Sequence, residues 1–337
     1  MLDELDLALV NAMQMRPRAP WSLLGETLGV SPVTAARRWQ RLSEAGIAWV
    51  TAYGGPFTWE RWCTAFLQLD CSTGRTARIA AIVAEDPHVL TVEHVADGCD
   101  LYLVTVFTDV TQLHRYIHQR LGRIEGINAV RSHLATHIYS EANGWRLGSL
   151  DASQRRHLRD GTPPAAGPAA EIRPEERELL VRLSTDGRME QAALASATGL
   201  SASTVRRRLD RMIASDTIRF RCEIAAPHAA RPVLVTYRAT VPADRLDLVG
   251  HAVARLPEVR LATAVTGARN LVVVVWLRSV ADSQRFESLL LHKFPELGVR
   301  ERAVTLHTSK RMGRILDEQG RAVRAVPMDL WRDPVSP

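Results

Sequence analysis

Lysine, cysteine and long apolar runs are all scarce in this chain. Lysine occurs only at Lys293 and Lys310, although lysine and arginine together number 43, so arginine supplies almost all of the positive charge. The four cysteines form no C-x-x-C pair and are typical of reduced thiols rather than a disulfide framework. The longest apolar run, LVVVVWL at 271–277, is far too short to cross a bilayer, and the acidic start MLDELDLALV lacks the pattern of a secretory leader. We therefore expect a soluble, cytoplasmic protein without a membrane partner.

Catalytic and metal-binding motifs are missing as well. The sequence contains no nucleophile elbow, P-loop or H-E-x-x-H motif. His114 and His118 share a predicted helix, and His133 and His137 share one face of a predicted strand, but no carboxylate or cysteine completes a spaced metal signature. We interpret these as surface histidines, and we predict no catalytic residue, no metal and no cofactor.

The chain is long and apolar enough for two or more domains. It has 337 residues, of which 46% are apolar and 24% charged, as in an ordinary globular protein. The net charge of +6 and the pI of about 9.5 permit an anionic partner without requiring one. We attribute the arginine excess to genome composition, so an arginine-rich helix is weaker support for phosphate contact here than in a balanced chain.

The stretch SASTVRRRLDRM at 201–212 organises the rest of the chain. Ser201 is a favourable helix N-cap, and Val205 and Leu209 lie on one face of the predicted helix, opposite a cationic face. The preceding QAALASATGL predicts a short helix that ends at Gly199. Two short helices joined by a tight glycine turn, the second amphipathic and cationic, match the helix-turn-helix pattern.

The same pattern occurs earlier in the chain. SPVTAARRWQRL begins at Ser31 and follows WSLLGETLGV, in which Gly29 stands where the later copy has Gly199. The serine, a threonine and three arginines recur at the same spacing. Residues 1–140 align with 171–310 without a gap, and chance rarely repeats a spacing, so we predict a tandem duplication.

Each helix-turn-helix is followed by a sheet-forming region. The pattern at 61–140 predicts the βαββαβ order of ferredoxin-like folds, and 231–310 repeats it. We therefore predict an α+β fold class, with winged-helix-type helix-turn-helix heads and ferredoxin-like modules, each present twice. The predicted divisions are a first head at 1–55, a first module at 61–140, a linker at 141–171 that includes GTPPAAGPAA, a second head at 172–223, a second module at 231–310 and a basic C-terminal tail at 311–337.

Arginine forks on the predicted recognition helices can grip phosphate or read guanine in the major groove. Arg206, Arg207 and Arg211 are the strongest candidates for DNA contact, and a solvated helix face is the alternative. For Arg38 and Arg208 the alternative is that they brace the heads by pairing with acids, and the serines and threonines are helix caps first and phosphate contacts second. The predicted DNA-binding set is Ser31, Val33, Thr34, Arg37, Arg38, Arg41, Ser201, Ser203, Thr204, Arg206, Arg207, Arg208 and Arg211.

A helix-turn-helix head joined to a βαββαβ module resembles the Lrp/AsnC (feast/famine) family of regulators. The residues that carry the resemblance are LDELDLALV, LGVSPVTAARRWQRLSEAG and, in the second copy, LSASTVRRRLDRM. The resemblance implies a regulator that binds double-stranded DNA, dimerises through its sheets and responds to a small molecule, often an amino acid. Typical members have one head and one module, whereas residues 1–310 resemble two members fused.

The resemblance also points to an effector site and to an assembly. Members usually carry Gly-x-x-Asp in the turn between the middle strands, and here the two turns read DGCD at 97–100 and GARN at 267–270, so the usual effector specificity is open. The two modules can pair within one chain or between chains, and we expect a homodimer or larger assembly that covers every open sheet face. The candidate effector residues are Asp97, Gly98, Asp100, Gly267, Arg269 and Asn270.

Two other functions stay open. Siroheme decarboxylases resemble the same two-domain plan with heads that no longer bind DNA, but such a site needs histidines and arginines in the module cavity, and His228 is the one suggestive residue. Absorbance in the porphyrin range after tetrapyrrole addition separates this enzyme from a regulator. The third reading is an architectural DNA-coating protein, whose binding is indifferent to sequence and to small molecules.

Overall fold

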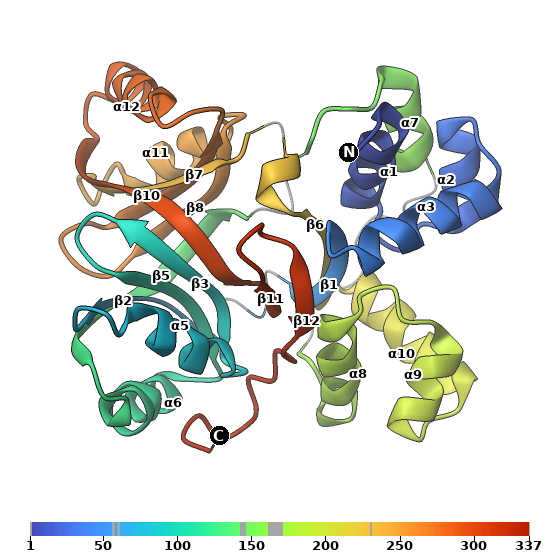
Figure 1. Cartoon of the computed structure of the whole chain (residues 1–337), viewed down its shortest axis with the longest axis horizontal. Coiled ribbons are helices and arrows are strands. Elements are labelled where there is room, and N and C mark those ends of the chain that lie inside the picture. Colours follow the sequence, from blue (N-terminus) through green and yellow to red (C-terminus); the bar gives the residue numbers. More distant parts are fainter. Residues whose placement is uncertain are drawn as a thin grey trace.

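The computed structural model describes residues 2–55, 58, 61–141, 146–160, 171–229 and 231–336. Two helical heads lie on one side of the molecule, and two sheet modules with their outer helices lie on the other (Figure 1). The segment GTPPAAGPAA of the predicted linker lies outside the described residues. Across the part of the chain that the structure describes, no helix combines the length and apolarity needed to cross a membrane.

Each head consists of three helices followed by a strand. The first head contains α1 (Glu4–Met15), α2 (Trp21–Leu28), α3 (Pro32–Glu44) and β1 (Ala48–Gly54), and the second contains α8 (Pro174–Thr185), α9 (Gln191–Thr198), α10 (Ala202–Ala214) and β6 (Ile218–Ile224). Each element of the second head begins 170 positions after its counterpart, as residues 4 and 174 or 32 and 202 show. The duplicated helix-turn-helix head is therefore reproduced to the residue.

Local signals determine the turn of each helix-turn-helix. Gly29 ends α2 and Gly199 ends α9, with φ angles of 69° and 68°, a left-handed conformation that would strain a residue with a side chain. Two residues later, Ser31 and Ser201 cap the next helix through their hydroxyl groups. Pro32 then occupies the first turn of α3, where a missing N–H costs little.

The modules have the predicted βαββαβ order. The first contains β2 (Cys63–Cys71), α5 (Thr76–Ala84), β3 (Val89–Ala96), β4 (Leu101–Phe107), α6 (Val110–Arg115), continued by the short turns η1 (Tyr116–Arg120) and η2 (Leu121–Arg123), and β5 (Ile127–Ser140). The second contains β7 (Val233–Thr240), α11 (Leu246–Val253), β8 (Val259–Val265), β9 (Leu271–Leu277), α12 (Asp282–Lys293) and β10 (Gly298–Arg311), and a short turn, η4 (Ala226–His228), precedes it. Apolar side chains between each sheet and its helices form two separate cores.

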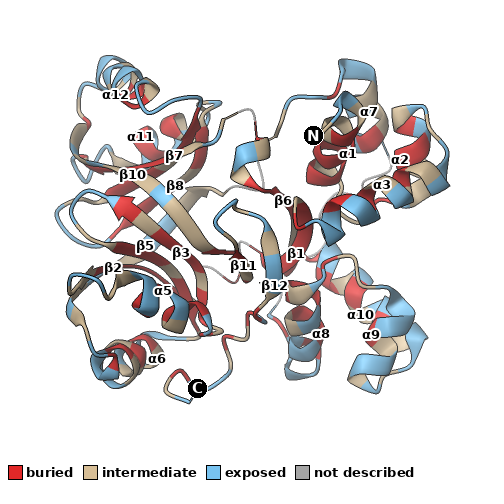
Figure 2. Ribbon diagram, viewed as in Figure 1, coloured by how far each residue is buried: buried red, intermediate tan, exposed pale blue. Residues whose placement is uncertain are grey.

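The two modules pair with each other inside one chain. Strand pairing runs β3-β4-β2-β5-β8-β9-β7-β10, and β10 also pairs with β3, so the hydrogen-bonded strands close into a barrel. Phe66, Tyr102 and Val272 pack in its interior, where the two sheets face one another. In Figure 2 the outer helix faces are exposed, most residues of β2, β4, β7, β8 and β9 are buried, and the two long strands β5 and β10, which join the modules, are mostly of intermediate or high exposure. The open sheet faces that suggested a homodimer thus cover each other within the chain. A homodimer stays a prediction, but an uncovered sheet face no longer supports it.

The register of the barrel repeats with the duplication. Ala135 of β5 pairs with Val265 of β8, and the residue 170 positions after Ala135, Thr305 of β10, pairs with Val95 of β3. Both ladders skip a residue at the next step. The two halves of the chain are therefore related by a pseudo-two-fold axis that passes through the barrel.

The segments outside the repeats are ordered structure rather than a plain linker and tail. In the predicted linker, Leu158 of α7 (Ala152–Arg159) and Leu150, just before this helix, pack into the core of the first head. The side-chain oxygen of Asn11 accepts a hydrogen bond from the N–H of Ser149 (2.8 Å). The sequence analysis missed α7 because the segment is strongly polar, with single leucines rather than a repeated apolar face.

The predicted basic tail forms a hairpin and a strap. Strands β11 (Arg314–Leu316) and β12 (Ala322–Ala325) extend the sheet from β10, and the chain then passes between the barrel and the second head (Figure 1). Met312, Met328 and Leu330 are buried there. In the described part of the first repeat, the segment after β5 contains α7 instead of such a strap, so the strap makes the two halves of the molecule unlike.

Candidate nucleic-acid interface and central cavity

The N-terminal turns of α3 and α10 form the exposed surface of the two heads. Ser31 Oγ accepts a hydrogen bond from the Thr34 N–H (3.0 Å), and Ser201 Oγ accepts one from the Thr204 N–H (3.2 Å). Val33 is 76% exposed, and Ser203, at the equivalent position, is also exposed. These side chains are placed where a partner can reach them, and no core packing requires them.

The candidate arginines divide into an exposed group and a bracing group. Arg37, Arg206 and Arg207 are exposed on the outer face of α3 and α10. Arg206 lies 3.8 Å from Asp210, one turn along the same helix, and an exposed pair at this spacing contributes only a few tenths of a kcal/mol. These three guanidinium groups are therefore available to an anionic partner.

The bracing arginines pair with acids on the first helix of each head. Arg38 contacts Asp3 and Asp6 at 2.7 and 2.8 Å, which is the pairing that the sequence analysis considered for it. Arg41 also pairs with Asp6, at 2.6 Å, and Asp6 is only 1% exposed. An ion pair with a buried carboxylate holds α3 against α1.

The second head has an equivalent brace, in which one of the two arginines bonds to a backbone oxygen instead of a carboxylate. Arg211 pairs with Glu176, which stands 170 positions after Asp6 and is also 1% exposed. Arg208 donates to the backbone oxygen of Glu175 (2.7 Å) rather than to a carboxylate. Arg41 and Arg211 thus have a structural role that the sequence analysis missed, although the recurrence of an acid at 6 and 176 was a signal for it.

The two heads are locked to each other across the pseudo-two-fold axis. Arg188 donates to the backbone oxygens of Pro17 (2.7 Å) and Ala19 (3.0 Å), and Arg18 donates to the equivalent oxygens of the other head, those of residues 187 and 189. Burial lowers the pKa of Arg188 to about 10. These reciprocal bonds fix the spacing between the two recognition helices.

A two-stranded ribbon completes the connection between the heads. Strands β1 and β6 pair antiparallel, with Ala48 opposite Ile224, Gly54 opposite Ile218 and Thr51 opposite Arg221 at the centre. Because Thr51 and Arg221 are equivalent residues of the two copies, the axis passes through this pair. The strand that follows each helix-turn-helix therefore pairs with its counterpart from the other head.

The predicted effector turns are engaged in local structure. Asp100 Oδ2 accepts a hydrogen bond from the Cys71 N–H (2.7 Å), and Asn270, its counterpart, accepts one from the Val241 N–H (2.9 Å). Asp97 and Gly98 form the left-handed part of the first turn. In the second turn Gly267 is also left-handed, and Arg269 pairs with Glu301. The change from aspartate to asparagine therefore preserves the same backbone contact.

The histidines are dispersed, and several have other partners. The rings of His114 and His118 lie 4.5 Å apart on the outer helix of the first module, whereas His133 contacts the buried guanidinium of Arg238. His137 packs against Tyr139. Within the described residues, no three side chains of histidine, cysteine, aspartate or glutamate are arranged to hold a metal ion.

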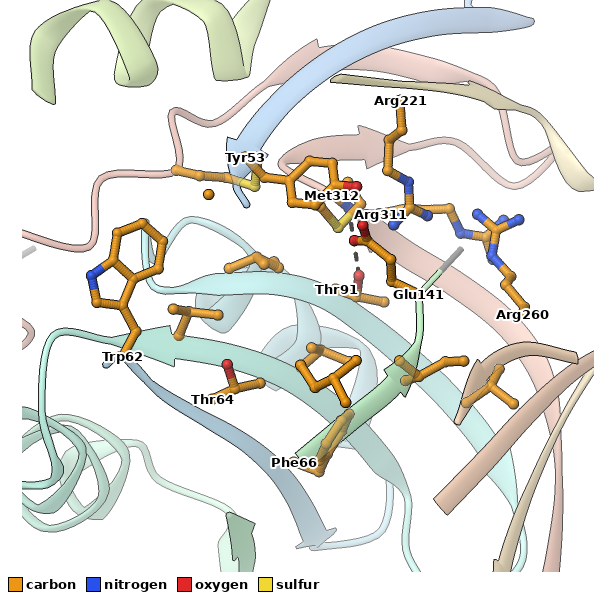
Figure 3. A pocket seen from close by; sticks show the side chains of 18 of the residues that line it. Tyr53, Trp62, Thr64, Phe66, Thr91, Glu141, Arg221, Arg260, Arg311 and Met312 are labelled. Carbon is orange, nitrogen blue, oxygen red and sulfur yellow. Dashed lines mark hydrogen bonds between the residues drawn. The ribbon is translucent and has the colours of Figure 1, made fainter. Parts of the chain in front are cut away.

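A cavity of about 180 Å³ lies between the β1–β6 ribbon and the open end of the barrel. We call it the central cavity. Figure 3 shows Trp62 at one end and Arg221, Arg260 and Arg311 together at the other. Apolar side chains line most of the space between them, and none of the described lining residues is a histidine.

At the charged end of the central cavity, two arginines share one carboxylate, that of Glu223. Glu223 is 2% exposed and pairs with Arg221 and with Arg260, the latter at 2.6 and 2.7 Å. Burial opposes ionisation of Glu223, but the guanidinium groups of Arg221, Arg260 and Arg311 outweigh it and lower the pKa to about 2. Burial lowers the pKa of Arg260 to about 9. Sequence reasoning missed this cluster because its members are scattered from 221 to 311.

Comparison with known proteins gives two family matches. The AsnC-type helix-turn-helix domain matches residues 2–43 and 176–213, and the Lrp/AsnC ligand binding domain matches 64–145. An uncharacterised HTH-type transcriptional regulator of Pyrococcus abyssi is 31% identical over 138 residues, which cover 41% of this chain and 87% of that protein. A similar regulator of Pyrococcus horikoshii is 25% identical over 138 residues, with the same coverage of both proteins.

Among solved structures, the siroheme decarboxylase NirDL in complex with an iron-uroporphyrin III analogue matches the whole architecture. The TM-score is 0.59 at 11% identity, over 97% of this chain and 96% of that one. At this identity the match concerns the fold: the duplicated arrangement of heads and modules exists in another single chain.

Proposed function

Because this chain belongs to the Lrp/AsnC family of transcriptional regulators, we propose that it binds double-stranded DNA in a sequence-specific manner through α3 and α10. The observation that carries the proposal is the pair of recognition helices, held at a fixed spacing by the β1–β6 ribbon and the Arg18 and Arg188 bonds. A rigid pair of heads suits two half-sites separated by one or more helical turns.

The heads are unlike, so the half-sites are expected to be unlike too. Arg206 of α10 stands where α3 has Ala36, which gives α10 one more arginine and places two adjacent exposed arginines, Arg206 and Arg207, on its outer face. An arginine fork can bind phosphate or pair with guanine in the major groove. We therefore infer that the second head supplies the larger share of affinity, and that binding falls steeply as salt rises.

Removing the exposed arginines of the second head tests this proposal. We expect Arg206→Ala/Arg207→Ala to weaken binding to a selected duplex at least about 30-fold, because each bidentate guanine contact is worth about 1–3 kcal/mol. Fluorescence anisotropy at about 0.15 M salt measures the change.

The matched control is Arg123→Ala/Arg255→Ala, which removes the same charge from exposed positions on the barrel side. It is expected to stay within about threefold of the wild type. An equal loss in both double variants would attribute binding to net charge and would contradict recognition by α10.

We also propose that a small molecule modulates this regulator. The match of residues 64–145 to a ligand-binding domain supports an effector. The turns at 97–100 and 267–270 remain candidates for part of its site. Asp100 and Asn270 already accept hydrogen bonds from the backbone, so other residues would have to contribute to binding the effector. Binding that ignores both sequence and small molecules would favour the architectural alternative.

A siroheme-decarboxylase-like activity is the second candidate function. The observation that favours it is the set of Arg221, Arg260 and Arg311 in the central cavity, since guanidinium groups can bind the carboxylates of a tetrapyrrole. His228 is not among the described residues that line the cavity, and none of these is a histidine that could supply a proton. A shifted porphyrin absorbance band on adding an iron-uroporphyrin to the protein, with loss of carboxyl groups from the pigment, would support the enzyme over the regulator.

A further inference from the structure

We propose that the central cavity binds an amphipathic carboxylate, a small molecule with an apolar, ring-containing body and one acid group, and that this molecule is the effector. The effector role rests on the proposed function. The binding step does not, because the cavity is complete in the chain without DNA.

The charges at one end of the cavity call for an added anion. Arg221, Arg260 and Arg311 line that end, and Glu223 is shared by the first two. Arg311 is 5% exposed and forms no direct ion pair with a carboxylate of the described residues, although its charge acts at longer range on Glu223 and Glu93. Its guanidinium donates to the Thr308 hydroxyl (3.1 Å). A buried guanidinium without a carboxylate is costly, and a ligand acid group can compensate it by a bidentate pair.

The other acids of the cavity do not fill this role. Glu141 pairs with Arg219 at 2.6 Å. Glu93 accepts a hydrogen bond from the Thr305 hydroxyl (3.3 Å); burial raises its pKa, and the nearby charge of Arg311 offsets this only in part. Arg311 therefore lacks a direct ion pair with these acids, and it lies next to the ring of Trp276, whose centroid is 5.4 Å from the guanidinium carbon.

The rest of the cavity suits an apolar body with a ring. Tyr53, Trp62, Phe66 and Tyr102 contribute aromatic surface, and Met312 contributes a flexible side chain that adapts to irregular shapes. Figure 3 places Trp62 at the end opposite the arginines, so a ligand lying along the cavity would put its acid group and its apolar group at opposite ends.

The asymmetry of the cavity follows from the duplication. Each arginine of the cavity has a different residue at the equivalent position of the first repeat, 170 positions earlier. These pairs are Glu141 and Arg311, Leu90 and Arg260, and Thr51 and Arg221. A symmetric dimer of single repeats would place each residue on both sides of the axis, with the same charge at both ends. In the fused chain the arginines lie at one end of the cavity, together with Glu223 and Glu141, and the opposite end is apolar, which matches a ligand whose two ends differ.

The cavity also touches the heads. Tyr53 belongs to β1 and Arg221 to β6, the ribbon that connects the recognition helices, whereas Arg260 and Arg311 belong to barrel strands. A ligand acid group between them would tie the ribbon to the barrel. It would thereby favour one orientation of the heads over others.

Calorimetric titration of the full chain without DNA tests binding, with 4-phenylbutyrate and its neutral amide as matched probes. We expect the carboxylate to bind at least about tenfold more tightly than the amide. Arg311→Met should abolish this preference, and Arg300→Met, an exposed arginine of the same strand, should retain it. Arg311→Lys keeps the charge and should retain part of the preference even if the methionine variant folds poorly.

Equal binding of acid and amide, or binding of neither, would overturn the proposed site. The same preparation is then tested for DNA binding with and without the carboxylate. Carboxylate binding without any DNA binding would overturn the effector role and the proposed function but leave the site in place. DNA binding without carboxylate binding would overturn the site alone.

Discussion

Replacing Glu223 with glutamine is expected to lower the free energy of unfolding by about 3–5 kcal/mol. Glu223 is 2% exposed and is the shared partner of Arg221 and Arg260, so the substitution leaves two buried guanidinium groups without their carboxylate. Urea denaturation at pH 7, followed by tryptophan fluorescence, measures the change.

The contribution of Glu223 also depends on pH. Its pKa is lowered from 4.5 to about 2, so the stabilisation is complete above the unfolded value and is lost as the pH falls toward 2. The difference between wild type and variant should therefore shrink in acid. Glu190→Gln, at an exposed position of the second head, serves as the control and should change stability by less than about 0.5 kcal/mol. A Glu223→Gln protein as stable as this control would contradict the ion-pair account.

Lys310 is expected to make the protein less stable in acid than in base. It is fully buried, its ammonium donates to the backbone oxygen of Asp86 (2.9 Å), and burial lowers its pKa from 10.5 to about 7. Between these values the unfolded chain binds more protons than the folded one, so stability rises with pH across this window. Over the whole window the free energy of unfolding is expected to rise by about 3–5 kcal/mol.

Comparing Lys310→Met with wild type isolates this effect. Methionine removes the charge but leaves the Asp86 oxygen without its donor, so the absolute change combines two opposing effects. The difference between variant and wild type should favour the variant most below pH 7 and decline toward pH 10, as thermal or urea unfolding at several pH values would show. Lys293, the other lysine, is exposed, so the stability difference between Lys293→Met and wild type should be the same at every pH. A flat difference for Lys310→Met would mean that Lys310 does not titrate in this window.

The duplication could be predicted because short sequence motifs determine the ends of its helices. The caps at Ser31 and Ser201 and the glycines at 29 and 199 act within a few residues, and the ungapped alignment carried the offset through both modules. The βαββαβ order followed from alternating strand and helix patterns in the same way.

The closure of the barrel and the division of the arginines could not be predicted in that way. Pairing of β5 with β8 and of β10 with β3 depends on long-range register, which the sequence left open between one chain and two. Arg41 and Arg37 have the same local pattern, and only the position of Asp6 on another helix makes Arg41 a brace. The central cavity combines residues of both copies and of the strap, so no local motif could indicate it.

The account also explains why the two halves have diverged. Within one chain, a residue at the axis no longer has to be compatible with a copy of itself, and Thr51 faces Arg221 in the ribbon. The same freedom applies to the recognition helices, where Ala36 corresponds to Arg206. We expect the divergence of the heads to appear as unlike half-sites in the DNA.

The most direct test of this account is selection of binding sites from random-sequence duplex DNA by the full chain at about 0.15 M salt. The account predicts an enriched site with two unlike half-sites at a fixed spacing, one of which disappears with Arg206→Ala/Arg207→Ala. No enrichment, together with salt-sensitive binding that this double variant leaves unchanged, would contradict sequence-specific recognition by the paired heads.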